Sequence, residues 1–122
     1  MKTILFPTDF SVHADKALTY AIRICEQTNS QLVVFNSSFI PETFQKKNQK
    51  KIIQKDKDYK QTMLEALVAE LCKKHKLQTP ENIVYAAKNG SLVVDNILSA
   101  SKKHNADLII VATHGMAGLQ KE

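Results

Sequence analysis

The sequence has few of the residues on which several protein classes depend. Its two cysteines, Cys25 and Cys72, lie 47 positions apart and form no CxxC motif, which excludes a disulfide scaffold and a zinc ribbon. This cysteine usage predicts a reducing, cytoplasmic setting. Three glycines and three prolines among 122 residues exclude a collagen-like or largely disordered chain. No apolar run approaches the roughly 20 residues of a membrane span and no export signal is visible at the start, so we expect no membrane partner.

The excess of positive charge is confined to one segment. The formal net charge is +5, and residues 46–60 hold seven lysines and two aspartates, which account for the whole excess. Tyr59 is the only aromatic residue in this segment, so we interpret it as a solvated loop and helix start and predict no nucleic-acid partner. Residues 41–58 are expected to begin as a surface loop and to be the most mobile part of the chain, because they combine dense charge with few apolar anchors.

Apolar spacing predicts a strand, a helix and a second strand near the start of the chain. The apolar run within residues 3–6 is too short for a buried helix and is closed by Pro7, so we expect a buried strand there. Between residues 14 and 25 the apolar positions recur at helical spacing, with Ser11 placed to cap the helix and Asn29 placed to end it. Residues 32–35 are apolar on both faces, which is typical of a central parallel strand.

The rest of the chain continues this alternation. Helical spacing returns at residues 63–76, and residues 83–87 predict a third strand that ends at a turn formed by Asn89 and Gly90. Ser91 is placed to cap a third helix. The apolar side of that helix is formed by Val93, Val94, Ile97 and Leu98.

A buried fourth strand is expected within residues 106–112, followed by a turn at residues 113–118. Strands and helices therefore alternate without a hairpin signal. This order predicts an α/β fold with a doubly wound parallel sheet, in one domain of residues 1–122. Ligands of such sheets bind at the carboxyl ends of the strands, where the winding direction reverses, which selects residues 7–11 and residues 113–118 as the candidate ligand loops.

These two loops resemble those of the universal stress protein family. Residues 4–11, ILFPTDFS, resemble its opening strand and loop, and residues 109–115, IIVATHG, resemble its fourth strand and the start of its phosphate loop. The resemblance implies a stress-response module with strand order 3-2-1-4-5, an adenine nucleotide (ATP or AMP) between strands 1 and 4, and a homodimer or a tandem-domain arrangement. In this chain the order would be 3-2-1-4, with the fifth strand and fourth helix missing, so we expect a longer natural protein.

The resemblance also implies which residues hold the nucleotide. Pro7, Thr8 and Asp9 would frame the adenine and the ribose, and Ser37 would lie against the base. Asp9 would also be placed to hold a Mg²⁺ that bridges the phosphates. The phosphate loop would comprise Ala112, Thr113, His114, Gly115 and Gly118.

The sequence departs from the family's phosphate pattern at two places. Ala112 stands where the first glycine is expected, and the distal Gly-Ser would fall at positions 125 and 126, beyond Glu122. Glycines matter there because phosphate oxygens accept N–H bonds from the loop, and a Cβ in the wrong place keeps the anion out. The added methyl of Ala112 would be neutral at negative φ.

Simpler roles for these residues stay open. Asp9 and Ser11 would serve the turn and helix start even without a ligand, and His114 would then only line its turn. No nucleophile elbow, carboxylate pair or His/Cys/Asp cluster is visible, so we expect no enzyme and no metal site, with slow ATP hydrolysis left open. Two functions follow: a nucleotide-binding stress module, or a dimerising interaction scaffold of the same fold without a ligand.

Overall fold

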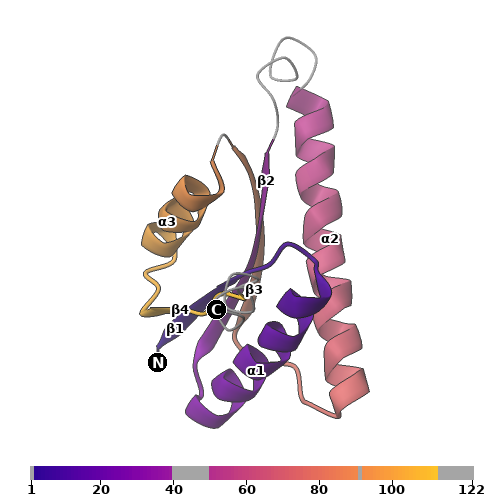
Figure 1. The fold of residues 1–122 in the computed structure, drawn as a ribbon, viewed down its shortest axis with the longest axis vertical. Helices are drawn as coiled ribbons and strands as arrows, with labels where there is room; N and C mark the ends of the chain where they lie inside the picture. Colours follow the sequence, from indigo (N-terminus) through magenta and orange to yellow (C-terminus); the bar gives the residue numbers. More distant parts are fainter. Residues whose placement is uncertain (1, 40–49, 91, 113–122) are drawn as a thin grey trace, which may run out of the picture.

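The structure is a computed structural model that describes residues 2–39, 50–90 and 92–112, which alternate between parallel strands and helices (Figure 1). The strands are β1 (Thr3–Pro7), β2 (Gln31–Phe39), β3 (Ile83–Gly90) and β4 (Leu108–Ile109), and the helices are α1 (Val12–Thr28), α2 (Lys50–His75) and α3 (Val93–Lys103). The sheet order is β3-β2-β1-β4. This order confirms the predicted α/β class, the parallel sheet and the order 3-2-1-4.

The sheet separates two helical layers, with α1 and α2 on one face and α3 on the other (Figure 1). Phe6 packs in the larger core under α1 and α2, whereas Leu5 packs in the smaller core under α3, because successive residues of a strand point to opposite faces. Both cysteines are free and buried in the larger core, which confirms their prediction as small buried hydrophobic residues.

The ends of α1 lie where the sequence predicts them. Ser11 is the N-cap, and its Oγ accepts a hydrogen bond of 3.1 Å from the Ala14 N–H. Asn29 ends the helix in the left-handed region, with φ at 53°, a conformation that asparagine tolerates better than most residues.

The second and third strands are longer than predicted, and the turn expected at Asn89 and Gly90 is wrong. β2 continues to Phe39, and its last residues pair with β3 in the register Ser38↔Asn89 and Phe39↔Gly90. The extended partner strand supplies the backbone hydrogen bonds that a turn would otherwise have to make. The sequence signal for a turn is therefore overridden by strand pairing.

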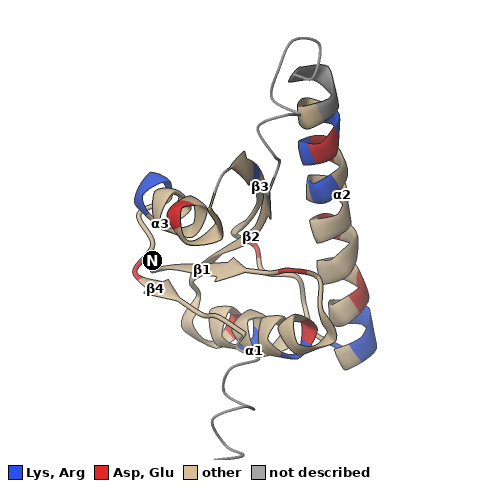
Figure 2. Cartoon of the chain, turned by 45° about the horizontal axis from the view of Figure 1, so that its top comes forward, with Lys and Arg blue, Asp and Glu red and all other residues tan. Residues whose placement is uncertain are grey.

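The polar stretch of residues 41–58, of which only the beginning is predicted as a loop, is helical from Lys50 onward, where α2 begins. Lysines and aspartates alternate on this part of α2 (Figure 2), and Gln54 Nε2 donates to Asp58 Oδ1 at 3.0 Å, one helical turn away. Asn89 Nδ2 on β3 donates to the Ile53 carbonyl at 3.0 Å, so the extended strand also anchors the helix. Residues 41–49 lie outside the described residues, and the expected mobility stays a prediction.

The apolar side predicted for α3 is largely wrong. Val93, Val94 and Leu98 are 51%, 66% and 53% exposed, whereas Asn96 and Ala100 are buried against the sheet. Leu92 occupies the N-cap position without a side-chain hydrogen bond. Ser91 lies outside the described residues. The helix is rotated so that a polar amide, rather than the valines, faces β2.

The fourth strand is shorter and more exposed than expected for residues 106–112. β4 pairs with β1 on one side, and no described strand covers its other side. Leu108 is therefore 50% exposed. Pairing with β1 continues past the strand, since the Ile110 N–H donates to the Leu5 carbonyl at 3.0 Å.

Candidate functional site

A pocket opens at the carboxyl ends of β1 and β4, the place where the direction of winding reverses. Its volume is about 160 Å³, which is below the roughly 300 Å³ at which pockets for drug-sized ligands begin. The described part of the site therefore suits one portion of a nucleotide. The lining residues are Pro7, Thr8, Asp9, Ala14, Ser37, Val93, Ile97, Val111 and Ala112.

The loop after β1 is held by its own side chains. Thr8 Oγ1 accepts from the Phe10 N–H at 3.0 Å, and Asp9 Oδ1 accepts from the Ser11 N–H at 2.9 Å. Phe10 adopts a φ of 66°, which is unusual for a bulky residue and is maintained where the surroundings over-determine the backbone. The loop is thus a preformed turn.

Buried polar contacts tie this loop to β2. The Thr8 N–H donates to the Phe35 carbonyl at 2.8 Å. The Asn36 side chain is buried, and its Nδ2 donates to the Thr8 carbonyl at 2.9 Å, while its Oδ1 accepts from Ser38 Oγ at 3.0 Å. Buried amides that are satisfied in this way add rigidity to the wall they form.

The opposite wall joins β2 to α3. Asn96 Nδ2 donates to Ser37 Oγ at 2.7 Å, and Asn96 itself is only 5% exposed. Sequence reasoning missed Asn96, although a signal was present: the residue is polar, yet it lies three positions after Val93 and four before Ala100 on the predicted helix. It missed the lining roles of Ala14, Val93, Ile97 and Val111 as well.

The pocket brings together five of the nine residues that the sequence nominated. These five are Pro7, Thr8, Asp9, Ser37 and Ala112, which come from β1, its loop, β2 and the segment after β4. The other four nominated residues, Thr113, His114, Gly115 and Gly118, lie outside the described residues. Their part in a phosphate site stays a prediction.

The chemistry of the lining favours a flat, mostly apolar group with a few polar edges. Ile97 and Val111 supply apolar surface, and Thr8, Asp9 and Ser37 supply the polar atoms. None of the described lining residues is lysine or arginine. The described pocket therefore suits a base and a sugar better than it suits a phosphate group.

Acidic side chains lie around Asp15, in the first turn of α1. Burial raises the pKa of Asp15, and the carboxylates of Glu70 and Asp9 raise it further, against a smaller lowering by Lys74. Asp15 Oδ1 is buried and accepts no hydrogen bond from a described residue. A carboxylate such as that of Asp9 favours hydroxyl groups or a cation over a bare phosphate. Among the described residues, no three His, Cys, Asp or Glu side chains gather as a metal site would require.

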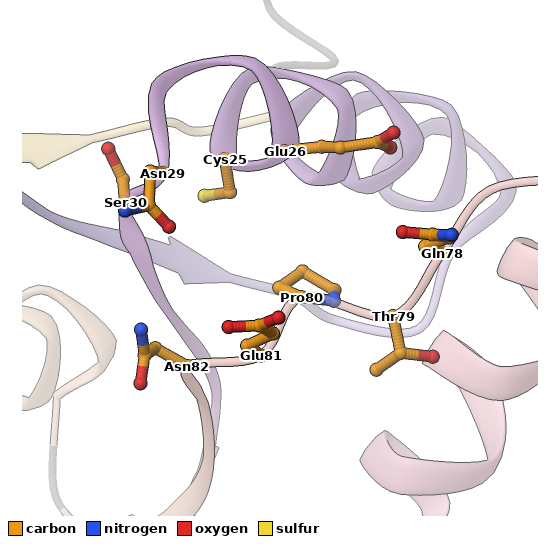
Figure 3. Close-up of a pocket in the computed structure, with 9 residues that line it drawn as sticks. All are labelled: Cys25, Glu26, Asn29, Ser30, Gln78, Thr79, Pro80, Glu81 and Asn82. Carbon is orange, nitrogen blue, oxygen red and sulfur yellow. The ribbon is translucent and has the colours of Figure 1, made fainter.

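A second cavity of about 160 Å³ lies at the opposite end of the strands from the pocket, where β2 and β3 begin (Figure 3). Cys25 and Glu26 reach it from α1, and the segment 78–82 forms its other side. Burial raises the pKa of the Cys25 thiol to about 11, so that thiol is protonated and unreactive at neutral pH. This cavity lies at the amino ends of the strands, where doubly wound sheets do not place ligands.

No helix in the described part of the chain is both long and apolar enough to cross a membrane. Figure 2 places the charged residues mainly on the helices and leaves the strands almost free of them.

The chain matches the model of the universal stress protein family over residues 1–121. No curated protein matches the chain.

Solved structures share the fold at low sequence identity. A member of the universal stress protein family from Burkholderia pseudomallei superimposes with a TM-score of 0.66 at 18% identity, covering 96% of this chain and 85% of that one. A universal stress protein in complex with cAMP gives 0.59 at 19% identity, with 88% and 69% covered. Universal stress protein UspA from Lactobacillus plantarum gives 0.57 at 19% identity, with 90% and 75% covered.

Proposed function

Because the chain belongs to the universal stress protein family, we propose that it is a stress-response module that binds an adenine nucleotide, ATP or AMP, between β1 and β4. One observation carries the proposal. The pocket at the carboxyl ends of these strands is formed by Pro7, Thr8, Asp9, Ser37 and Ala112 together, although these residues lie up to 105 positions apart in the sequence.

In this proposal the base lies in the described pocket. Ile97 and Val111 of the lining cover the faces of the base. Burying an aromatic ring against such apolar side chains stabilises the complex by about 25 cal/mol per Å² of apolar surface removed from water. Asp9 accepts hydrogen bonds from the ribose hydroxyls, or holds Mg²⁺ together with the phosphates. The phosphates point toward residues 113–118, where backbone N–H groups would supply the positive ends that the described lining lacks.

The similar structure in complex with cAMP supports an adenine nucleotide as the ligand class, since cAMP has the same base and sugar as AMP. We further propose that the chain is cytoplasmic and has no enzymatic activity, slow hydrolysis of bound ATP aside. Nucleotide occupancy would change self-association, as a homodimer or tandem pair, or contacts with a partner.

A second candidate, an interaction scaffold without a ligand, is favoured by a different observation. Leu92, Val93, Val94 and Leu98 on and beside α3 are all more than half exposed, and apolar side chains exposed together often mark a contact with another protein. In that case the loop after β1 serves only its turn and the start of α1.

A titration separates the two candidates. We expect AMP to bind the 122-residue chain weakly, in the range seen by ligand-observed NMR, with ATP and cAMP tested beside it. Asp9→Ala should weaken AMP binding by about tenfold, the low end for a hydrogen bond to a charged group, because Asp9 is exposed.

Asp95→Ala is the matched control, since it removes an equally exposed carboxylate that does not line the pocket. Thermal melts should show both variants folded. If none of the three nucleotides binds, the nucleotide function is wrong and the scaffold remains. If both variants weaken binding equally, net charge rather than the position of Asp9 controls affinity.

A further inference from the structure

The hydrogen bond between Asn96 and Ser37 has a defined direction. Asn96 Nδ2 donates and Ser37 Oγ accepts, at 2.7 Å. A hydroxyl oxygen that receives an N–H along one lone pair cannot aim its own hydrogen along the same line. The Ser37 hydroxyl hydrogen is therefore directed away from Asn96.

The side chain of Asn96 is tightly packed at this position. Asn96 is 5% exposed, and it packs against the backbone of Gly90 at the end of β3. A Cβ at Gly90 would lie 2.4 Å from Asn96 Oδ1 and 2.7 Å from its Nδ2. The site thus accommodates the amide only because residue 90 has no side chain, and the amide has little room to turn.

Ser37 lines the pocket, whereas Asn96 does not. We propose that Asn96 is a positioning residue that makes Ser37 a hydrogen-bond donor toward the ligand, and that the pocket thereby selects a base with an unprotonated ring nitrogen at this edge. The inference rests on the proposed nucleotide function. It adds to that function an orientation of the Ser37 hydroxyl, whose hydrogen is directed away from Asn96 and is available to the ligand.

The chemistry predicts a specific discrimination. Replacing the ring nitrogen that faces Ser37 by C–H removes the acceptor without changing the shape of the base. Loss of one neutral hydrogen bond corresponds to a roughly 3- to 10-fold loss of affinity. Analogues altered at the other ring nitrogens keep the acceptor and should lose much less.

The experiment titrates the 122-residue chain with AMP and with its 1-deaza, 3-deaza and 7-deaza analogues. We expect the wild type to bind one of the three analogues 3- to 10-fold more weakly than AMP. Asn96→Asp keeps the shape of the side chain but turns the donor into an acceptor, so the Ser37 hydroxyl then donates to it and presents a lone pair to the pocket. The ratio of the affinity for AMP to the affinity for the sensitive analogue should fall to about 1 or below.

A structural role of Asn96 would change stability and the affinity for all four ligands, but not their ratio. Should Asn96→Asp fail to fold in thermal melts, Ser37→Ala provides the second variant, and it should also bring the ratio to about 1. Asn105→Asp and Ser99→Ala are the matched controls, because neither residue lines the pocket, and both should keep the wild-type ratio of affinities.

The outcomes are distinguishable. A wild type that binds AMP and all three analogues equally overturns the role of Asn96 and leaves the proposed nucleotide function standing. A wild-type ratio retained in Ser37→Ala also overturns that role. Absence of binding by the wild type to all four ligands overturns the nucleotide function, and the inference with it.

Discussion

Gly90→Ala tests the packing that holds Asn96 in place, independently of any ligand. The added Cβ would lie 2.4 Å from Asn96 Oδ1 and 2.9 Å from its Cγ, and carbon and oxygen atoms do not approach this closely. No glycine with positive φ is present among the described residues, so the alanine meets no backbone strain at Gly90. The amide of Asn96 has to move instead, and its 2.7 Å bond to Ser37 Oγ breaks.

The cost follows from these opposing effects. Leaving a buried polar group without its partner costs about 1–3 kcal/mol, and replacing a glycine within a strand returns about 0.5–1 kcal/mol. The net destabilisation should be about 1–2 kcal/mol. For a chain of this size that corresponds to a fall in Tm of about 4–8 °C.

A double-mutant cycle with Asn96→Ala measures the coupling energy between residues 90 and 96. Urea denaturation of the wild type, both single variants and the double variant should show that Gly90→Ala costs almost nothing once the amide is gone. Thr62→Ala, on the far side of the sheet on α2, is the control partner and should be additive with Gly90→Ala. Additivity with Asn96→Ala would refute the proposed clash.

Three further predictions concern the rest of the fold. Ser11→Ala should lower the free energy of unfolding by about 1 kcal/mol, through loss of the N-cap bond to α1, in urea denaturation; no loss would show that the cap is dispensable. Asp15→Asn should raise Tm at neutral pH, because the folded-state pKa of Asp15 lies above 3.8, and the ionised carboxylate then costs stability that returns as pH falls through that pKa. The gain in free energy of unfolding should be below about 1 kcal/mol, since Asp15 is only partly buried. An equal gain at a pH well below the pKa of Asp15 would show that its charge is not the cause. Cys25, 2% exposed with a pKa of about 11, should react with iodoacetamide only after denaturation, and rapid labelling of the native chain would contradict its burial.

Local patterns in the sequence were sufficient to predict the parallel α/β class and the buried face of α1, whereas the strand order followed from the resemblance to the family. The helical spacing from Ala14 to Cys25 describes the face of α1 that is buried, and the apolar run of β2 describes a central strand. Both patterns are clear because α1 packs directly on the sheet, so the apolar residues of α1 and β2 share the larger core. The prediction of a ligand site at the switch point followed from topology, and the pocket lies there.

The errors arise where long-range partners overrode local signals. Asn89 and Gly90 read as a turn, yet pairing with Ser38 and Phe39 keeps them in β3. The valines of α3 read as its buried side, yet they are exposed, whereas Asn96 is buried and donates a hydrogen bond to Ser37 on β2. Neither partner is close in sequence, so no local window contains the information needed.

The sheet is stepped at the pocket, because β1 ends at Pro7 opposite Phe35 while β2 and β3 run on to Phe39 and Gly90. Among the described side chains of β2, which exclude that of Phe39, none beyond Phe35 belongs to either core cluster. Ser37 thus shapes the pocket from a stretch of β2 whose described side chains lie outside both core clusters. Substitution at Ser37 can change which ligand the site accepts while the fold beneath it persists, which makes this position the natural one for redesigning ligand preference.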